Sequence, residues 1–170
     1  MRITAILALT AVSCLGLVAP SVAQQWVEYR PADGAYRIEF PGQPKEQEAT
    51  TANGKRMHLA IVTLDAGTEY AISVGAVGKE SVSRPADEIL DKVRDALVKA
   101  TRGTLHDERS LTVSGVTARR FAIEAPEQIV HMQILVKADV LYQLIRDGAV
   151  GHEDNIATER FLDSFQFLDN

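Results

Sequence analysis

The sequence has 170 residues, 46% of them hydrophobic, and its 18 basic and 23 acidic residues give a net charge of −5. This length suits one ordinary domain with a hydrophobic core of its own. The acidic balance argues against nucleic acid and anionic lipid as partners, because both need a basic surface. The longest basic cluster, Arg119-Arg120, is interpreted as the surface of a strand rather than as a phosphate site.

The first 23 residues have the pattern of a secretory signal peptide. Arg2 supplies a positive charge, residues 3–19 are uncharged and mostly apolar, and the small residues Ser21 and Ala23 suit a signal-peptidase site. We predict cleavage after Ala23, a periplasmic or secreted location, and no stable membrane anchor once the signal is removed. The apolar run is at the lower limit for spanning a bilayer, so a retained anchor is the alternative. Cleavage removes one charge, that of Arg2, and changes the net charge from −5 to −6.

The only cysteine, Cys14, lies within the predicted signal peptide. A lipid attached there would require the chain to become polar after it, whereas the apolar run continues. The predicted mature chain therefore has no cysteine and no disulfide, although its compartment permits disulfides. Its hydrophobic core must stabilise it alone.

Residues 24–170 are predicted to form a single domain that begins with strands. Turn residues separate the strands, and Asn53-Gly54 is a strong hairpin signal. The segment "FPGQP" (40–44) is interpreted as the end of a strand, because Pro41 lacks a ladder donor and Gly42 permits a corner. Alternating apolar and polar residues predict five strands, over 26–30, 35–40, 45–51, 56–64 and 68–77.

A helix is predicted to follow over residues 81–103. Ser83 is the expected N-cap, Pro85 is tolerated in the first turn, and Gly103 is expected to close the helix. An apolar stripe at helical spacing should cover one face of the sheet, and it consists of Ile89, Leu90, Val93, Leu97 and Ala100.

Four more strands and a second helix complete the predicted domain. The strands span 105–113, 116–125, 128–138 and 140–147, and the dense apolar run of the last predicts a central strand. The C-terminal helix is predicted to continue at least to Ser164, with Phe161 and Phe165 buried on the sheet. Short turns between neighbouring strands predict an α+β fold with an antiparallel sheet flanked by helices.

Two segments around the central helix, "WVEYRPADGAYRIEFPGQP" (26–44) and "ERFLDSFQF" (159–167), resemble small secreted bacterial proteins of unassigned function. Through them the chain resembles the PsbP-like domains, named for the extrinsic photosystem II protein, whose fold group includes a Ran-binding nuclear import factor. The resemblance implies an αβα sandwich, and it transfers no functional residue. The fold group mostly supplies binding and assembly modules, so by analogy it favours a protein that is not an enzyme.

The sequence lacks the common motifs of hydrolytic and phosphate-binding enzymes. No G-x-S-x-G elbow and no S-x-x-K pair occurs in it. The segment "SVGAVGKE" (73–80) is too short for a phosphate loop, and Glu80 stands where a serine or threonine would bind magnesium. We therefore predict no catalytic residue and no cofactor.

Two local groups of metal-binding residue types are the weak candidates for a metal site. If folding brought them together, they would offer ligands for a divalent cation. The alternative, which we favour, is a solvated strand start and a helix start without a metal. The two groups are His106, Asp107 and Glu108, and His152, Glu153 and Asp154.

Three functional hypotheses are compatible with the sequence. The favoured one is a non-catalytic extracytoplasmic module that binds or assembles with another protein of the cell envelope. The others are a carrier of a small molecule or metal in a cleft between sheet and helix, and an enzyme with a dispersed site. A large apolar pocket with converging polar groups would favour the last two, and an exposed apolar patch over a filled core would favour the first.

Overall fold

The structure, a computed structural model, describes residues 25–51, 54–64, 67–78, 81 and 84–168. The predicted signal peptide, its cleavage site and the predicted N-cap Ser83 lie outside the described residues. No helix within the described ranges is long and apolar enough to cross a membrane.

Strands dominate the described chain, and two helices interrupt them. The elements are β1 (Val27–Tyr29), β2 (Tyr36–Phe40), β3 (Lys45–Thr50), β4 (Arg56–Thr63), β5 (Glu69–Ala76), α1 (Ala86–Thr101), β6 (Thr104–Val113), β7 (Val116–Glu124), β8 (Gln128–Lys137), β9 (Val140–Ala149), α2 (Asn155–Asp163) and β10 (Gln166–Phe167).

The strands form two antiparallel sheets. The larger has seven strands in the order β3-β4-β5-β9-β8-β7-β6, and the smaller has three in the order β1-β2-β10. The predicted strands are confirmed within a few residues, and β9 is the middle strand of the larger sheet, as its dense apolar run predicted. Tight turns with positive φ join the last hairpins, at Ser114-Gly115 and at Ala138-Asp139.

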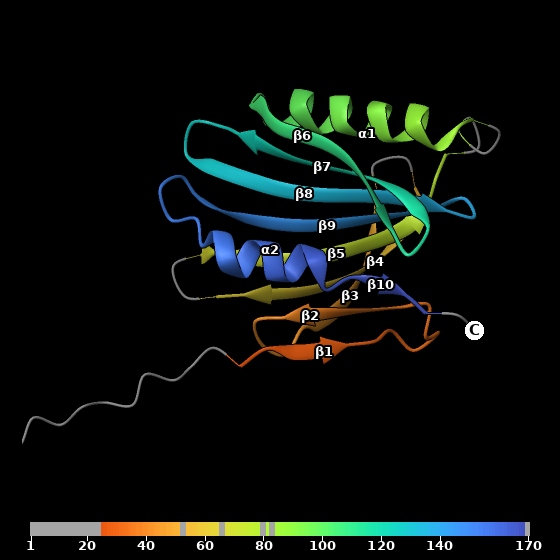
Figure 1. Ribbon diagram of the computed structural model, residues 1–170, viewed down its shortest axis with the longest axis horizontal. Coiled ribbons are helices and arrows are strands. Elements are labelled where there is room, and N and C mark those ends of the chain that lie inside the picture. The colour runs from red at the N-terminus through yellow and green to blue at the C-terminus, as the bar shows by residue number, and fades with distance from the viewer. Residues whose placement is uncertain (1–24, 52–53, 65–66, 79–80, 82–83, 169–170) are drawn as a thin grey trace, which may run out of the picture.

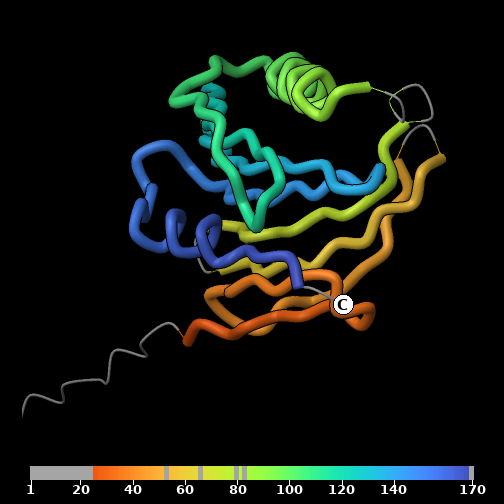
Figure 2. The backbone as a smooth tube through the Cα atoms, turned by 45° about the vertical axis from the view of Figure 1, so that its right-hand side comes forward, coloured from red at the N-terminus to blue at the C-terminus, as the bar shows by residue number. Residues whose placement is uncertain are grey.

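The layers correspond to the predicted sandwich, and the separate three-stranded sheet is an addition to it. Helix α1 lies on one face of the large sheet, whereas α2 and the small sheet lie on the other (Figures 1 and 2). The main core lies between the large sheet, α2 and the small sheet, and includes Tyr36, Phe40, Tyr70 and Phe161. A smaller core lies under α1, around Leu90 and Met132.

Helix α1 is shorter than predicted, and a different residue closes it. The helix starts after Pro85, which provides no side-chain cap, and it ends at Arg102 in a left-handed conformation with φ of 54°. The prediction that Gly103 closes the helix is therefore wrong. Gly103 instead permits a close approach, because a Cβ there would lie 2.5 Å from Ile123 Cγ2 and 2.7 Å from the Glu124 carbonyl oxygen.

The C-terminal helix also ends earlier than predicted. The helix stops at Asp163, with Ser164 as its C-cap, and the chain then forms β10 along β2. A strand forms there because the backbone of Gln166–Phe167 pairs with the edge of β2, which the local sequence does not reveal. The predicted burial of Phe161 and Phe165 is confirmed, since they are 0% and 1% exposed.

Candidate functional site: a groove beside helix α1

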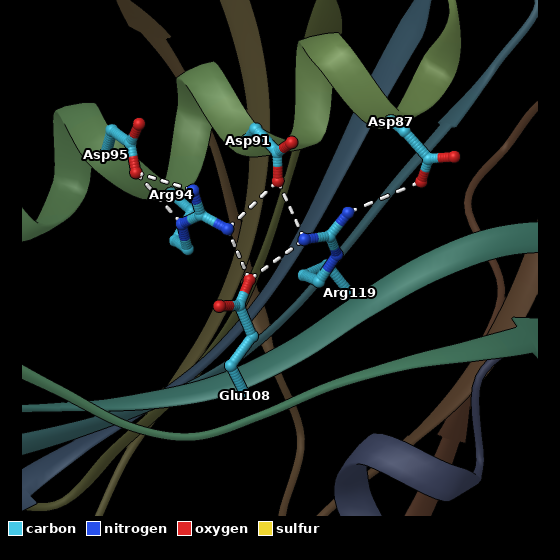
Figure 3. Close-up of polar contacts among 6 residues, drawn as sticks. All are labelled: Asp87, Asp91, Arg94, Asp95, Glu108 and Arg119. Carbon is cyan, nitrogen blue, oxygen red and sulfur yellow. Dashed lines mark hydrogen bonds and ion pairs between the residues drawn. The ribbon is translucent and has the colours of Figure 1, made fainter.

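One flank of helix α1 is held by a network of ion pairs to strands β6 and β7 (Figure 3). Arg119 on β7 lies 2.7 Å from Asp91 and 3.0 Å from Glu108 on β6. Arg94 on the helix bonds the same Glu108 oxygen at 2.5 Å and Asp91 at 2.9 Å. Burial alone would raise the pKa of Glu108, but the two guanidinium groups outweigh it and lower that pKa. We call this network the α1 clamp.

The α1 clamp determines which part of the sheet the helix covers. It connects α1 to β6 and β7, at one edge of the large sheet, and the helix packs mainly on β7 and β8. The strands β4 and β5 lie towards the other edge. The opposite flank of α1 therefore faces a part of the same sheet face that the helix does not cover, so the helix covers one face as predicted, but only in part.

A groove of about 270 Å³ lies along this opposite flank. Its wall is the helix stripe formed by Ile89, Val93 and Ala96, whose spacing places these residues on one side of a helix. Its floor includes Met57, Gly75 and Leu141, which are neighbours across β4, β5 and β9. Most of the lining is apolar, as in sites that bind small molecules.

Gly75 has no side chain that could fill the groove from the side of the sheet. A Cβ at this position would lie 3.0 Å from Met57 Cγ and 3.2 Å from the Arg56 carbonyl oxygen. Any side chain there would have to displace Met57 or project upward into the groove. The absence of a side chain is therefore the local reason for a hollow over β5.

The polar groups of the groove carry positive charge. Lys55 and Lys92 line it, together with the side chains of Thr51, Ser81 and Gln143. No carboxylate is among the described residues of its lining. The charged residues that the structure describes in the lining are therefore both lysines.

A second polar cluster lies on the other face, below the start of α2. Arg146 is only 1% exposed, and its Nη2 donates to the His152 carbonyl oxygen at 2.8 Å. Its Nε and Nη1 have no hydrogen-bond partner among the described residues. His131 lies opposite it on β8, and burial together with the charge of Arg146 lowers the pKa of that imidazole. The cluster therefore combines the buried cation Arg146 with His131, whose neutral form is favoured.

Arg119 and Arg120 do not form the predicted solvent-exposed strand surface. Alternation along β7 sends Arg119 to the α1 clamp and Arg120 to the opposite face. There Arg120 is 6% exposed, bonds Gln133, and lies 2.7 Å from both Glu159 and Asp163. Arg120 can be buried and Arg119 partly buried because acidic residues that are distant in sequence pair with them.

The side chains of the first predicted metal group, His106, Asp107 and Glu108, do not converge on one point. Glu108 belongs to the α1 clamp, and His106 lies 3.5 Å from Glu124. Asp107 sits at a β-bulge with φ of 53°, which turns neighbouring side chains to different faces.

The second predicted metal group, His152, Glu153 and Asp154, directly precedes helix α2. Asp154 caps this helix by accepting from the Ala157 amide at 3.0 Å, and Glu153 accepts from the Gly151 amide. The described part of the chain holds no group of three or more His, Cys, Asp or Glu side chains arranged to hold a metal ion. Metal independence stays a prediction.

The sequence-based carrier hypothesis included a cleft between sheet and helix but did not locate it. Two signals relate to the groove: Ile89 and Val93 of the predicted stripe line it together with Ala96, and Gly75-Ala76 leaves small residues at the end of a strand. Neither signal predicts a groove without the position of the helix over the sheet, which depends on pairing with β6 and β7.

Comparisons with known proteins give one clear result, and it concerns the fold. No model of a known protein family matches the chain, and no curated protein matches it. Among solved structures, the chain is similar to the solution structure of cyanobacterial PsbP (CyanoP) from Synechocystis, with a TM-score of 0.60. The alignment covers 91% of this chain and 99% of that chain at 10% sequence identity.

The fold is PsbP-like. The likeness extends over nearly the whole of both chains. At 10% identity it concerns architecture alone. The residues of the groove are therefore interpreted from their own geometry.

Proposed function

We propose that the protein is a non-catalytic binding module that works outside the cytoplasm, and that the groove beside α1 is its binding site. The observation that supports a binding site here is the groove itself, a concavity whose lining is mostly apolar and includes a few polar residues, and this feature fits the carrier hypothesis as well as a binding module. The signal-peptide pattern of residues 1–23 supports the location. The partner that the sequence favours is another protein of the cell envelope, to which the module would bind or assemble.

Three serines of the described chain have hydroxyl groups with structural partners. Ser73 donates to the Met57 sulfur, Ser114 accepts from the Phe167 amide, and Ser164 bonds the main chain of Glu39 and Phe161. None of these three hydroxyls is bonded to a histidine that would act as its general base. They serve the packing of strands and helix ends.

A carrier of a small apolar molecule is the second candidate function. The observation that favours it is the largely apolar lining of the groove, which includes Met57, Val93 and Leu141. A concave site of this kind suits a compact ligand better than a flat docking surface does.

Site-specific photo-crosslinking in the cells that produce the protein tests the proposed function. A photoreactive residue replaces Ala96, which is exposed and lines the groove, or Ala100, which is exposed on the same helix and is not in the groove lining. We expect one discrete adduct from position 96 and none from position 100. The purified adduct partner must then raise the thermal midpoint of the unmodified protein. Equal labelling from both positions, or none from either, would contradict a site in the groove.

A further inference from the structure

A second concavity lies on the opposite face of the large sheet, between the start of α2 and strands β6, β7 and β8. Its volume is about 230 Å³, and the structure describes every segment that lines it without a gap. Asn155 and Glu159 of α2 form one side, and Asp107, Arg109 and His131 belong to the strands. We call this concavity the α2 pocket.

The charges in the lining of the α2 pocket balance each other. Asp107 and Glu159 are its acidic residues, and Arg109 and Arg120 are its basic residues. His131 favours its neutral form at neutral pH, because burial and a neighbouring arginine lower its pKa. A ligand with a charge of one sign would disturb this balance, whereas a ligand that carries both signs would preserve it.

One charge of each sign is available to a ligand. Glu159 lies 2.7 Å from Arg120, which has Asp163 as a further partner. Arg109 has only a 3.3 Å contact with the same Glu159, between side chains that are 56% and 50% exposed, and such surface pairs contribute little. Asp107 has no ion-pair partner in the described part of the chain, although the residues on either side of it do.

The backbone at Asp107 also indicates a function. Its φ is 53°, at the point where the register of β6 shifts against β7. This left-handed conformation favours glycine over a residue with a side chain. Such strain and such bulges occur often beside binding sites, where they redirect a side chain. Here the side chain that is redirected is a carboxylate in the lining of a polar pocket.

We propose that the α2 pocket binds a zwitterionic α-amino acid, with the ammonium group of the ligand at Asp107 and its carboxylate at Arg109. The amide of Asn155, which both donates and accepts hydrogen bonds, serves either group. The pocket shares no lining residue with the groove beside α1. This inference is therefore independent of the proposed function.

A set of matched ligands tests the need for both charges. Isothermal titration of the folded mature protein with each standard amino acid identifies the best ligand, which we expect to bind at millimolar concentration or below. Its deamino acid and its decarboxylated amine keep the same side chain and lose one charge each. Both should bind at least about tenfold more weakly, because each lacks one charge-assisted hydrogen bond.

Two variants assign the two charges to their partners. Asp107→Asn should remove the preference for the amino acid over its deamino analogue, and Arg109→Gln should remove the preference over the amine. A purely structural role of either residue would weaken all three ligands alike. Glu127→Gln and Arg30→Gln are the matched controls and should keep both preferences, because both side chains are exposed and outside the lining.

A third variant separates binding from folding. Asp107→Gly should melt at an unchanged or higher temperature, because glycine adopts a positive φ without strain, and it should not bind the amino acid. The inference is wrong if no standard amino acid binds at millimolar concentration, if an analogue or glucose binds as tightly as the best amino acid, or if Asp107→Gly binds it unchanged. The crosslink from position 96 reports on the groove alone, so its outcome does not depend on these results.

Discussion

At the scale of single residues, the most unusual environment is that of His131 and Arg146. The buried guanidinium of Arg146 lies opposite the half-buried imidazole on the neighbouring strand, and the His131 Nε2 has no partner among the described residues. Glu153, Glu159 and Asp107 face the same imidazole and favour its charged form, but burial and Arg146 outweigh them. The pKa of His131 is therefore lowered from the ordinary value of 6.5.

This lowered pKa makes the stability of the protein dependent on pH. Below about pH 6.5, His131 binds a proton in the unfolded chain but stays neutral in the folded protein until the pH is lower. The free energy of unfolding should therefore fall as the pH drops. The slope from one such group is at most about 1.4 kcal/mol per pH unit. Urea denaturation between about pH 5 and about pH 8 measures it. The His131→Gln variant should have a shallower slope, and His106→Gln, changed at an exposed histidine, should keep that of the wild type.

Phe161 is a fully buried aromatic residue whose truncation should be strongly destabilising. Its ring is 0% exposed and lies 5.3 Å from the rings of both Phe40 and Tyr70. Phe161→Ala should lower the free energy of unfolding by roughly 3–5 kcal/mol, a large share of the roughly 5–15 kcal/mol that a domain has. Chemical denaturation checks this. Ile156→Ala on the same helix, at a side chain that is 86% exposed, should change stability by less than about 0.5 kcal/mol.

At the scale of elements, the α1 clamp determines where the helix lies and therefore whether the groove exists. The side chains of Arg119 and Arg94 are 12% and 17% exposed, whereas their acidic partners are more open. Such pairs are intermediate between surface pairs, which contribute little, and buried pairs, which are costly to break. The apolar contacts of Leu90 and Leu97 under the helix supply the rest of its attachment.

Removing Arg119 should loosen α1 on its clamped flank. Arg119→Ala should lower the free energy of unfolding by roughly 1–2 kcal/mol, and the difference from wild type should shrink at high salt, where charges are screened. Thermal denaturation at low and high ionic strength measures both effects. Arg30→Ala, which breaks an exposed pair with Glu28, should have almost no effect at either salt concentration. A loss that is independent of salt would assign the role of Arg119 to packing of its side chain.

The fold was predictable at this scale wherever a signal is local. Strand alternation, the turn residues Ser114-Gly115 and the stripe of α1 all repeat within a few residues, and the structure agrees with them. Strand β10 was missed because two residues become a strand only by pairing with β2. The clamp was missed for the same reason, since Asp91, Glu108 and Arg119 meet through tertiary packing.

At the scale of the whole molecule, the predicted export of the chain is open to a direct test. The exported protein should begin at Gln24, because the charged start, the apolar run and the small residues before it fit signal-peptidase cleavage. The intact mass of the protein recovered outside the cytoplasm measures this. A species that retains residues 1–23, or one that carries a lipid on Cys14, would contradict the soluble extracytoplasmic form.

Metal independence is a second property of the whole molecule. The thermal midpoint should not change with a chelator or with zinc, copper, manganese or calcium. A ligand that binds the folded state at a hundred times its Kd adds about 2.7 kcal/mol, which for a domain of this size is a shift of about 5–10 °C. A reproducible shift with one metal, lost when His106 and His152 are both changed to Ala, would establish the metal site that we regard as the weaker alternative.

The amino-acid sequence by itself determined the α+β class, the strand order along the chain, the central place of β9 and the burial of Phe161 and Phe165. These follow from periodicity and turn chemistry, which act over neighbouring residues. Only the tertiary structure decided that Arg119 and Arg120 pair with acidic residues on opposite faces, and that α1 covers part of its sheet face and leaves a groove over Gly75. The physical reason is that ion pairs and cavities form between segments that are far apart in the sequence. A local residue pattern carries no information about which of these segments pack together.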